Sequence, residues 1–257
     1  HEPVEVFGPE DAPPLSAGAS FTVLCWNLQF AGSRRHHFFY DGGRAVHVPP
    51  ADVEATTTGI TDLLAQHAPD LALLQEIDRD ADRTGRKDQL RRYLTHAPRL
   101  RWASTPYHRA PYVPHPLHQP MGRVDLHLGI LSRRGLLDAS RTALPLLDEP
   151  RLRQMFNLKR ALMTAAVPIE GGRILRVANT HLSAFSRGDG TLAKQVAALR
   201  AWMEAQPTDQ PWILAGDFNL LPPGDTPGRL STESDLYADA TNPIEALLPG
   251  FQEAFGD

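Results

Sequence analysis

Polar residues suited to phosphate or metal chemistry stand at the ends of several apolar runs in this sequence. The run Trp212-Ile213-Leu214-Ala215 leads through Gly216 into Asp217-Phe218-Asn219. Because side chains alternate faces along a strand, Asp217 and Asn219 point the same way if the extended geometry persists past Gly216. Alone, a Gly-Asp-x-Asn stretch is more typical of a turn. A functional interpretation of this stretch is supported by three similar strand ends. They carry Asn27, Glu76, and Asn179 with His181.

This set of side chains suits the metal-assisted hydrolysis of a phosphate ester. Glu76 offers an oxygen ligand of the kind that Mg²⁺ or Mn²⁺ takes, and these ions often keep several waters. Asp217 could orient or deprotonate an attacking water, and Asn219 could donate a hydrogen bond to a phosphate oxygen. His181 could hold or protonate a phosphoryl or leaving oxygen. Simpler alternatives stay open at this point: Asn27 as a turn residue, Glu76 as a surface carboxylate and His181 as a core histidine.

Strands and helices in alternation must position these residues. Apolar runs predict strands over 21–26, 70–75, 126–132 and from Trp212, and a hairpin over 161–169 and 173–179. Helical patterns cover 52–67, 84–97, 191–205 and a short stretch at 243–248. Two long loops are expected over 31–50 and 105–124. We predict an α/β (α+β) fold, with residues 1–20 as a loose lead-in and residues 21–257 as a single domain.

Composition and charge limit the class of protein. The chain has 257 residues, of which 42% are apolar and 22% charged, as in ordinary globular proteins. The formal net charge of −4 argues against binding nucleic acid by bulk charge alone, although it leaves room for a local basic groove. Cys25 is the single cysteine, so no internal disulfide can form, which fits a reducing compartment. No stretch approaches the length of a membrane span, and we expect a monomer.

The N-terminal sequence does not indicate a cellular compartment. The first residue is His1 rather than Met and no signal peptide is visible, so we expect that the start has been trimmed. Localisation therefore cannot be read from the start of the chain. The single cysteine and the absence of a visible signal peptide favour the cytoplasm.

Four motifs, in the same order along the chain, resemble the endonuclease/exonuclease/phosphatase superfamily, also called DNase I-like. They are Trp26-Asn27-Leu28-Gln29, Leu74-Gln75-Glu76-Ile77-Asp78, Asn179-Thr180-His181-Leu182 and Gly216-Asp217-Phe218-Asn219, with a softer match at Gly129-Ile130-Leu131-Ser132. The resemblance implies a four-layer α/β sandwich, in which two mixed β-sheets pack face to face with helices outside. It also implies a phosphoesterase that uses a divalent metal, with Glu76 as the metal carboxylate and Asn27 assisting. His181 would be the catalytic or phosphate-contacting histidine, and Asp217 with Asn219 would orient water and bind phosphate.

The sequence departs from the pattern of this superfamily in one respect. The family pattern ends in a late strand and a Ser-Asp-His segment, whose histidine is a main catalytic base. Here 38 residues follow Asn219, and no histidine follows His181. We therefore expect that the natural chain is longer and that the domain is C-terminally incomplete, because missing strands would leave sheet edges unpaired. The alternative is an incomplete active site.

Substrate choice in this superfamily lies in loops. The loops 31–50 and 105–124 offer imidazole and guanidinium side chains, and arginine suits bidentate contact with phosphate. Aromatic residues are sparse, so no stacking platform is evident. The residues that we expect to contact substrate, each with a surface role as its alternative, are Asn179, Arg34, Arg35, His115, His118 and Arg123.

These observations predict a phosphodiesterase that depends on Mg²⁺ or Mn²⁺ and is nuclease-like, with nucleic acid as one candidate substrate. Water would attack phosphorus with the help of the metal. A phosphomonoesterase or a sphingomyelinase-type hydrolase is the alternative among enzymes. A non-catalytic binding scaffold that lost the final catalytic histidine is the alternative of another class.

Overall fold

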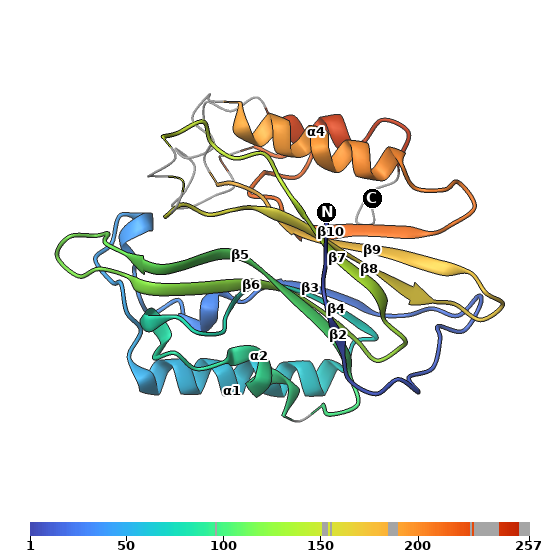
Figure 1. Ribbon diagram of the computed structural model, residues 1–257, viewed down its shortest axis with the longest axis horizontal. Helices are drawn as coiled ribbons and strands as arrows, with labels where there is room; N and C mark the ends of the chain where they lie inside the picture. The colour runs from blue at the N-terminus through green and yellow to red at the C-terminus, as the bar shows by residue number, and fades with distance from the viewer. Residues whose placement is uncertain are drawn as a thin grey trace.

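Two five-stranded sheets lie face to face (Figure 1). The computed structural model describes residues 1–95, 97–150, 154, 156–184, 190–226, 228 and 242–251. The sheet that we call the β4 sheet has the order β2-β5-β6-β4-β3, with bounds Val6–Phe7, Arg101–Val113, Gly122–Ser132, Leu71–Asp78 and Val23–Asn27. The β9 sheet has the order β1-β7-β8-β9-β10, with bounds Glu2–Pro3, Leu137–Ala143, Ala161–Pro168, Ile174–His181 and Trp212–Asp217.

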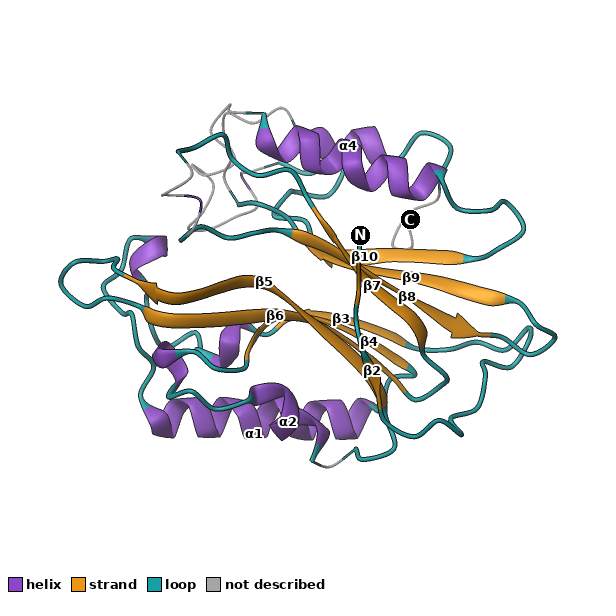
Figure 2. Ribbon diagram, in the orientation of Figure 1, coloured by secondary structure: helices purple, strands orange, loops and turns teal. Residues whose placement is uncertain are grey.

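Helices form the two outer layers (Figure 2). The β4 sheet is covered by α1 (Pro50–His67) and α2 (Gln89–Leu94), and the β9 sheet by α4 (Thr191–Glu204). Short 3-10 helices occupy Gln29–Ala31, Phe39–Asp41, Asp82–Thr84 and Pro243–Leu247. This is the four-layer α/β sandwich with two mixed sheets that the sequence analysis predicts. In the part of the chain that the structure describes, no helix has the length and apolar character to cross a bilayer.

Each sheet ends in one pair of parallel strands. β3 connects to β4 through α1, and β9 connects to β10 through α4, while the other neighbouring strands run antiparallel. In register, Asn27 lies beside Gln75, and Asp217 lies beside His181. Because the two strands of a parallel pair share a carboxyl end, polar residues at these ends come together. The fold thus places the predicted chemistry at one end of the sandwich.

The main core fills the space between the sheets. Alternate residues of β6, from Val124 to Ile130, belong to the same buried apolar cluster as Met163 of β8 and Val177 of β9. Two further clusters involve residues of α1 and α2 on one side and of α4 on the other. Apolar alternation along the strands therefore accounts for the face-to-face packing.

A buried pair of amide side chains joins the two sheets within this core. Gln75 of β4 donates from Nε2 to Oδ1 of Asn179 on β9 at 2.7 Å. Asn179 in turn donates from Nδ2 to the carbonyl oxygens of Leu74 at 3.0 Å and Gly129 at 2.9 Å, both in the β4 sheet. We call Gln75 and Asn179 the amide clamp. Because buried amides without partners are costly, these bonds fix how one sheet sits on the other.

The expected loop over 105–124 is largely the long hairpin of β5 and β6. Its prolines are compatible with pairing because the register shifts between Pro106 and His108 and again between Ala110 and Val113. The helix expected over 84–97 is also shorter, since α2 begins after Asp88, whose side chain accepts the N–H of Arg91. Proline content and a basic helical pattern were therefore poor guides to these boundaries.

The expected loose lead-in over residues 1–20 contributes to both sheets. β1 pairs with β7 and β2 pairs with β5, both antiparallel. Val4 and Val6 pack against the main core. The open edges of β5 and β7 explain the pairing, because an edge strand presents unpaired N–H and C=O groups.

Gly216 permits β10 to approach β9 closely. Its φ is +152°, and a Cβ there would lie 2.1 Å from the carbonyl oxygen of Thr180. We expect Gly216→Ala to lower the free energy of unfolding by about 2 kcal/mol, because overpacking forces the backbone to shift. Thermal unfolding measures this, with Gly59→Ala in α1 as a control that should keep or raise stability, since nothing lies within 4 Å of its Cβ position. An unchanged melting temperature for Gly216→Ala would contradict this account.

Candidate active site

The ends of the parallel strands bring Asn27, Glu76, His181 and Asp217 together, and we call these four residues the central cluster. Asn27 donates from Nδ2 to Oε1 of Glu76 at 3.1 Å and to Oδ2 of Asp217 at 2.7 Å. One carboxamide therefore connects a carboxylate of the β4 sheet with a carboxylate of the β9 sheet. Oδ1 of Asn27 accepts the backbone N–H of Gln29 at 2.9 Å, which sets the orientation of the amide.

Glu76 enters the central cluster through an irregularity in β4. Its φ is +57°, an uncommon value for a residue with a side chain. The register of β4 against β6 also shifts between Leu74 and Ile77. The side chain is 19% exposed. Burial raises the pKa of the Glu76 carboxyl, while Arg83 and the hydrogen bond from Asn27 act against the rise. Strained backbone of this kind persists where the surroundings enforce it, often at functional sites.

Asp217 accepts hydrogen bonds at both carboxylate oxygens. Besides the bond from Asn27, its Oδ1 accepts the backbone N–H of Asn219 at 2.9 Å. The side chain is 26% exposed and is thus open to a ligand. Asn219 has a φ of +50° and donates from Nδ2 to the carbonyl oxygen of Leu182 at 2.9 Å. Asn219 therefore lies next to the central cluster and anchors the chain just after His181.

His181 lies between the two carboxylates. Its Nδ1 is 3.8 Å from Oε1 of Glu76, and its Nε2 is 3.7 Å from Oδ2 of Asp217. The ring is buried, and burial together with the charge of Arg160 holds the pKa of His181 well below its usual range. The imidazole is therefore neutral at neutral pH, with one nitrogen as donor and the other as acceptor.

Tyr107 orients the ring of His181 through its Nδ1 atom. Its Oη lies 3.1 Å from Nδ1 of His181. Burial raises the pKa of Tyr107 well above its usual range, so the hydroxyl stays protonated. A protonated hydroxyl can either donate to Nδ1 or accept from an N–H there, so the contact orients the ring and is compatible with both tautomers.

Arg160 is the functional candidate that the sequence analysis missed. It directly precedes β8 and is 5% exposed. Its Nε and Nη1 atoms are buried, and neither has a hydrogen-bond partner among the described residues. Burial lowers the pKa of its guanidinium, and Tyr107 together with the carboxylates of the central cluster opposes the shift. The sequence signal is slight, because a single arginine before an apolar strand has no periodic pattern, and Tyr107 falls in the stretch expected to be a loop.

The predicted substrate-contacting residues are spread over several places. Asn179 is buried in the amide clamp. Arg35 lies 3.8 Å from Asp52, and Arg123 lies 2.7 Å from Asp80, each in an ion pair. The exposed members are Arg34, Arg35, His115 and His118. Across the described ranges, none of these six predicted residues has a hydrogen bond or ion pair with the central cluster.

The oxygen donors of the central cluster fit a hard divalent cation. Within the described part of the chain, no three His, Cys, Asp or Glu side chains form a ready metal cage. Mg²⁺, however, is commonly held by one or two carboxylates and keeps several waters. In that same part, Glu76 has no ion pair with Arg or Lys, and its pairing partner is the neutral ring of His181. A cation bound at Glu76 would therefore offset the cost of burying its charge.

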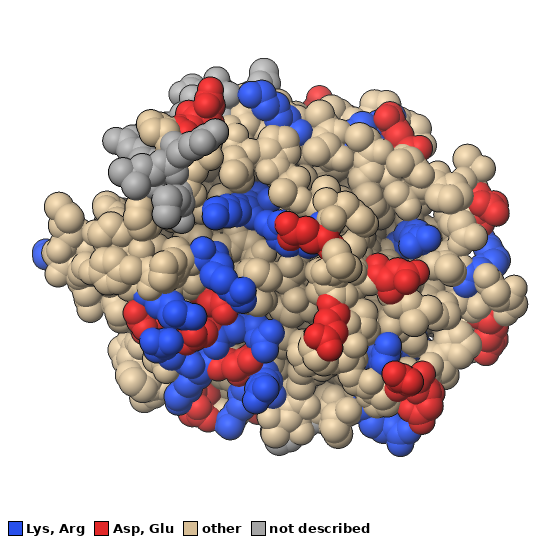
Figure 3. Space-filling model, viewed as in Figure 1, with Lys and Arg blue, Asp and Glu red and all other residues tan. Residues whose placement is uncertain are grey.

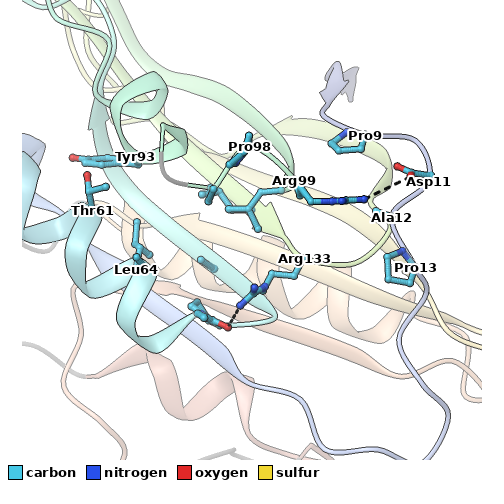
Figure 4. Close-up of a pocket in the computed structure, with 17 residues that line it drawn as sticks. Pro9, Asp11, Ala12, Pro13, Thr61, Leu64, Tyr93, Pro98, Arg99 and Arg133 are labelled. Carbon is cyan, nitrogen blue, oxygen red and sulfur yellow. Dashed lines mark hydrogen bonds and ion pairs between the residues drawn. The ribbon is translucent and has the colours of Figure 1, made fainter.

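Two cavities differ in their relation to the central cluster. A cavity of about 780 Å³ follows β10 and is lined by Asn27, Asp217 and Asn219 among others. A second cavity of about 450 Å³ lies between α1 and residues 9–13 (Figure 4). There Arg99 reaches toward Asp11 at 3.8 Å. None of the central cluster lines this second cavity, so the first is the one associated with the candidate site.

Sequence comparison identifies one family. The sequence model described as "Endonuclease/Exonuclease/phosphatase family" matches residues 24–256. No curated protein matches the chain by sequence. The match covers most of the chain, including all four members of the central cluster.

Solved structures share the fold at low sequence identity. The endonuclease/exonuclease/phosphatase from Beutenbergia cavernae aligns with a TM-score of 0.56 and 20% identity, over 84% of this chain and 51% of its own. The mannosyl-6-phosphatase of Bacteroides thetaiotaomicron aligns with a TM-score of 0.54 and 14% identity, over 90% of this chain and 70% of its own. The human nocturnin catalytic domain with bound sulfate aligns with a TM-score of 0.50 and 17% identity, over 86% of this chain and 69% of its own. The chain thus spans about half the length of the Beutenbergia protein.

Proposed function

The chain belongs to the endonuclease/exonuclease/phosphatase family, and on this premise we propose that it hydrolyses a phosphodiester with the help of Mg²⁺ or Mn²⁺. In this reaction the oxygen of water bonds to phosphorus, the bond from phosphorus to the leaving alcohol breaks, and a proton passes to the leaving oxygen. The residues proposed for it are Asn27, Glu76, His181, Asp217, Asn219 and Arg160.

One observation carries the proposal. Two carboxylates from different sheets converge on the amide of Asn27, while a buried guanidinium with free N–H groups stands close to the same cluster. The carboxylates suit a cation, and the free N–H groups of Arg160 suit the oxygens of a phosphate. A core built only for stability would not leave a buried arginine with two donor atoms that have no partner among the described residues.

Each residue has a proposed part in the reaction. Glu76 would hold the metal with the support of Asn27, and the chemistry that the metal would supply is positive charge to offset the charge that builds on the phosphoryl group. Asp217 accepts a proton from the attacking water or orients it. Nε2 of His181 and the guanidinium of Arg160 donate hydrogen bonds to phosphoryl oxygens. Asn219 binds phosphate beside them.

The surface favours local recognition of substrate over bulk attraction. In the face that Figure 3 shows, Lys and Arg side chains are interspersed with Asp and Glu rather than gathered into one basic area. Basic and acidic side chains also form ion pairs, such as Arg86 with Asp80 and Arg109 with Asp125. The net charge of −4 agrees with it. A nuclease-like activity would therefore depend on contacts near the reacting phosphate.

A phosphomonoester is the second candidate substrate. It is favoured by the similarity in fold to a mannosyl-6-phosphatase. A compact site that holds a single phosphate serves a monoester as well as a diester. Comparing mannose 6-phosphate with bis-p-nitrophenyl phosphate and plasmid DNA in one assay separates these classes.

Glu76→Gln is expected to abolish metal-dependent turnover and to weaken Mn²⁺ binding at least about tenfold, because it removes the charge of the proposed metal ligand. Hydrolysis of bis-p-nitrophenyl phosphate measures turnover, and calorimetric titration with Mn²⁺ measures binding without turnover. The assay uses residues 1–257.

Glu204→Gln is the matched control for this experiment, because the ion pair that Glu204 makes within the described part of the chain is with Arg200 on the surface of α4. It should leave both measurements unchanged. Wild-type turnover and Mn²⁺ affinity in Glu76→Gln would remove Glu76 from the metal site. Absence of turnover on all three substrates in the wild-type chain would favour the binding scaffold.

A further inference from the structure

A column of aromatic rings leads from the core to the surface beside the central cluster, and we call Phe30, Phe38 and Tyr40 the aromatic column. Phe30 and Phe38 are both buried and meet edge to face, with ring centres 5.1 Å apart. Phe38 and Tyr40 are stacked at 5.4 Å with an angle of only 4° between their planes. Tyr40 is 48% exposed, so the column ends in a ring that is backed by Phe38 and belongs to a residue that reaches solvent.

The inner end of the aromatic column is fixed to β4. The guanidinium of Arg83 lies 3.6 Å from the centre of the Phe30 ring. Arg83 donates from Nε and Nη2 to the two carboxylate oxygens of Asp78 at 2.8 and 2.9 Å. Asp78 is two residues beyond Glu76 on the same strand. A bidentate, buried ion pair of this kind holds the column in a set position relative to Glu76.

The backbone that carries the aromatic column is also held tightly. Gln29, Phe30 and Ala31 all have φ between +44° and +54°, a rare conformation for residues with side chains. The carbonyl oxygen of Phe30 accepts Nε2 of Gln89 at 2.6 Å. At Gly32, a Cβ would lie 2.7 Å from the ring of Phe30, so glycine permits this packing. The ring of Tyr40 is thus positioned before any ligand arrives, which lowers the entropic cost of binding.

The outer end of the aromatic column faces the candidate site. The hydroxyl of Tyr40 pairs with the side chain of Gln29, whose backbone N–H is bonded to Asn27. The pKa of Tyr40 is raised by burial of its hydroxyl and, in addition, by the negative charge of Glu76. Next to Tyr40, the ring of Phe39 meets it at 5.4 Å and also meets His115 at 5.4 Å. The structure therefore gathers aromatic rings where the sequence analysis saw no stacking platform.

We infer that the open face of Tyr40 binds a planar ring in the group esterified to the phosphate, either a nucleobase or an aryl group. The inference rests on the proposed phosphoesterase function and narrows its substrate class. An exposed ring that is already stacked from behind offers a π-face of fixed orientation to a second ring. Stacking of this kind accepts any flat ring, because it does not read hydrogen-bonding edges.

The test compares the binding of three phosphonates that resist hydrolysis: methylphosphonate, phenylphosphonate and 5′-deoxythymidine 5′-phosphonate. Calorimetric titration with Mg²⁺ present measures their affinities for the wild-type chain, for Tyr40→Phe, which keeps the ring, and for Tyr40→Leu, which removes it. We expect the wild type and Tyr40→Phe to bind the two ring-bearing ligands about tenfold more tightly than methylphosphonate. Tyr40→Leu should lose this preference while its affinity for methylphosphonate stays the same.

The outcomes separate the inference from the function on which it rests. A preference for the thymidine ligand over phenylphosphonate would identify a nucleobase, and equal binding would identify ring stacking without regard to source. Equal affinity of all three ligands for the wild type, or an unchanged preference in Tyr40→Leu, would overturn the inference and leave the phosphate site intact. Failure of all three ligands to bind would overturn both.

Discussion

Asp217→Asn is expected to lower kcat by about 10²- to 10³-fold while the fold stays intact, because a carboxamide keeps the shape of the side chain but cannot accept a proton. Asp217 accepts hydrogen bonds at both oxygens, from Asn27 and from the backbone of Asn219. An asparagine would have to turn its NH₂ group toward one of these two donors. The loss of turnover should therefore come with a small decrease in melting temperature.

The measurement for Asp217→Asn combines steady-state hydrolysis with thermal unfolding. Asp62→Asn, an exposed position on α1, removes one carboxylate in the same way and should leave both quantities unchanged. If Asp217→Asn turned over substrate at the wild-type rate, another group would have to orient the water. A large loss of stability would instead assign Asp217 a structural role.

Arg160→Met is expected to lower kcat/KM by about 10²- to 10³-fold and yet to keep or raise the stability of the fold. The activity falls because the variant removes the donors proposed for the phosphoryl oxygens. The stability holds or rises because Nε and Nη1 of Arg160 are buried with no partner in the described structure, and an apolar side chain of similar length ends that cost. Opposite changes in activity and stability would mark a residue retained for its chemistry.

Arg160→Lys refines the same experiment. It keeps the positive charge near His181 but loses the planar fork of donors, so we expect an intermediate rate. Urea unfolding and steady-state kinetics on the three chains give both quantities. If Arg160→Met unfolded at lower urea than the wild type and its folded fraction kept full activity, Arg160 would be structural and the proposed phosphate contact would be wrong.

The sequence predicts the strand ends better than it predicts which of them meet. Apolar runs locate β3, β4, β9 and β10, and the polar residue at each end follows from reading the chain. The contact between Asn27 and Asp217 depends on how two sheets pack, which no local pattern encodes. Asn179 illustrates the gap: by type it resembles a ligand-binding residue, but its partners in the opposite sheet make it part of the amide clamp. The catalytic and binding roles themselves stay predictions.

Residues without periodicity were the ones that sequence reasoning missed. Tyr107 lies on β5, whose prolines imitate a loop until the register shifts beside them are known. Arg160 carries meaning only through its burial and its charged neighbours. Tyr40 becomes a platform because Phe38 stacks behind it, within a loop whose backbone angles are uncommon. In each case the role of the residue depends on its contacts in the folded chain, which no local sequence pattern predicts.

The amide clamp bears on how the rate should respond to salt. Gln75 and Asn179 are neutral and buried, so dissolved ions do not screen the bonds that hold the two sheets in alignment. Glu76 directly follows Gln75 along the chain, and His181 is two residues after Asn179. We therefore expect the spacing between the proposed metal-binding and water-orienting halves to be insensitive to ionic strength. A salt titration of kcat/KM would report the encounter with an anionic substrate, and kcat at saturation would report the unaltered geometry of the site.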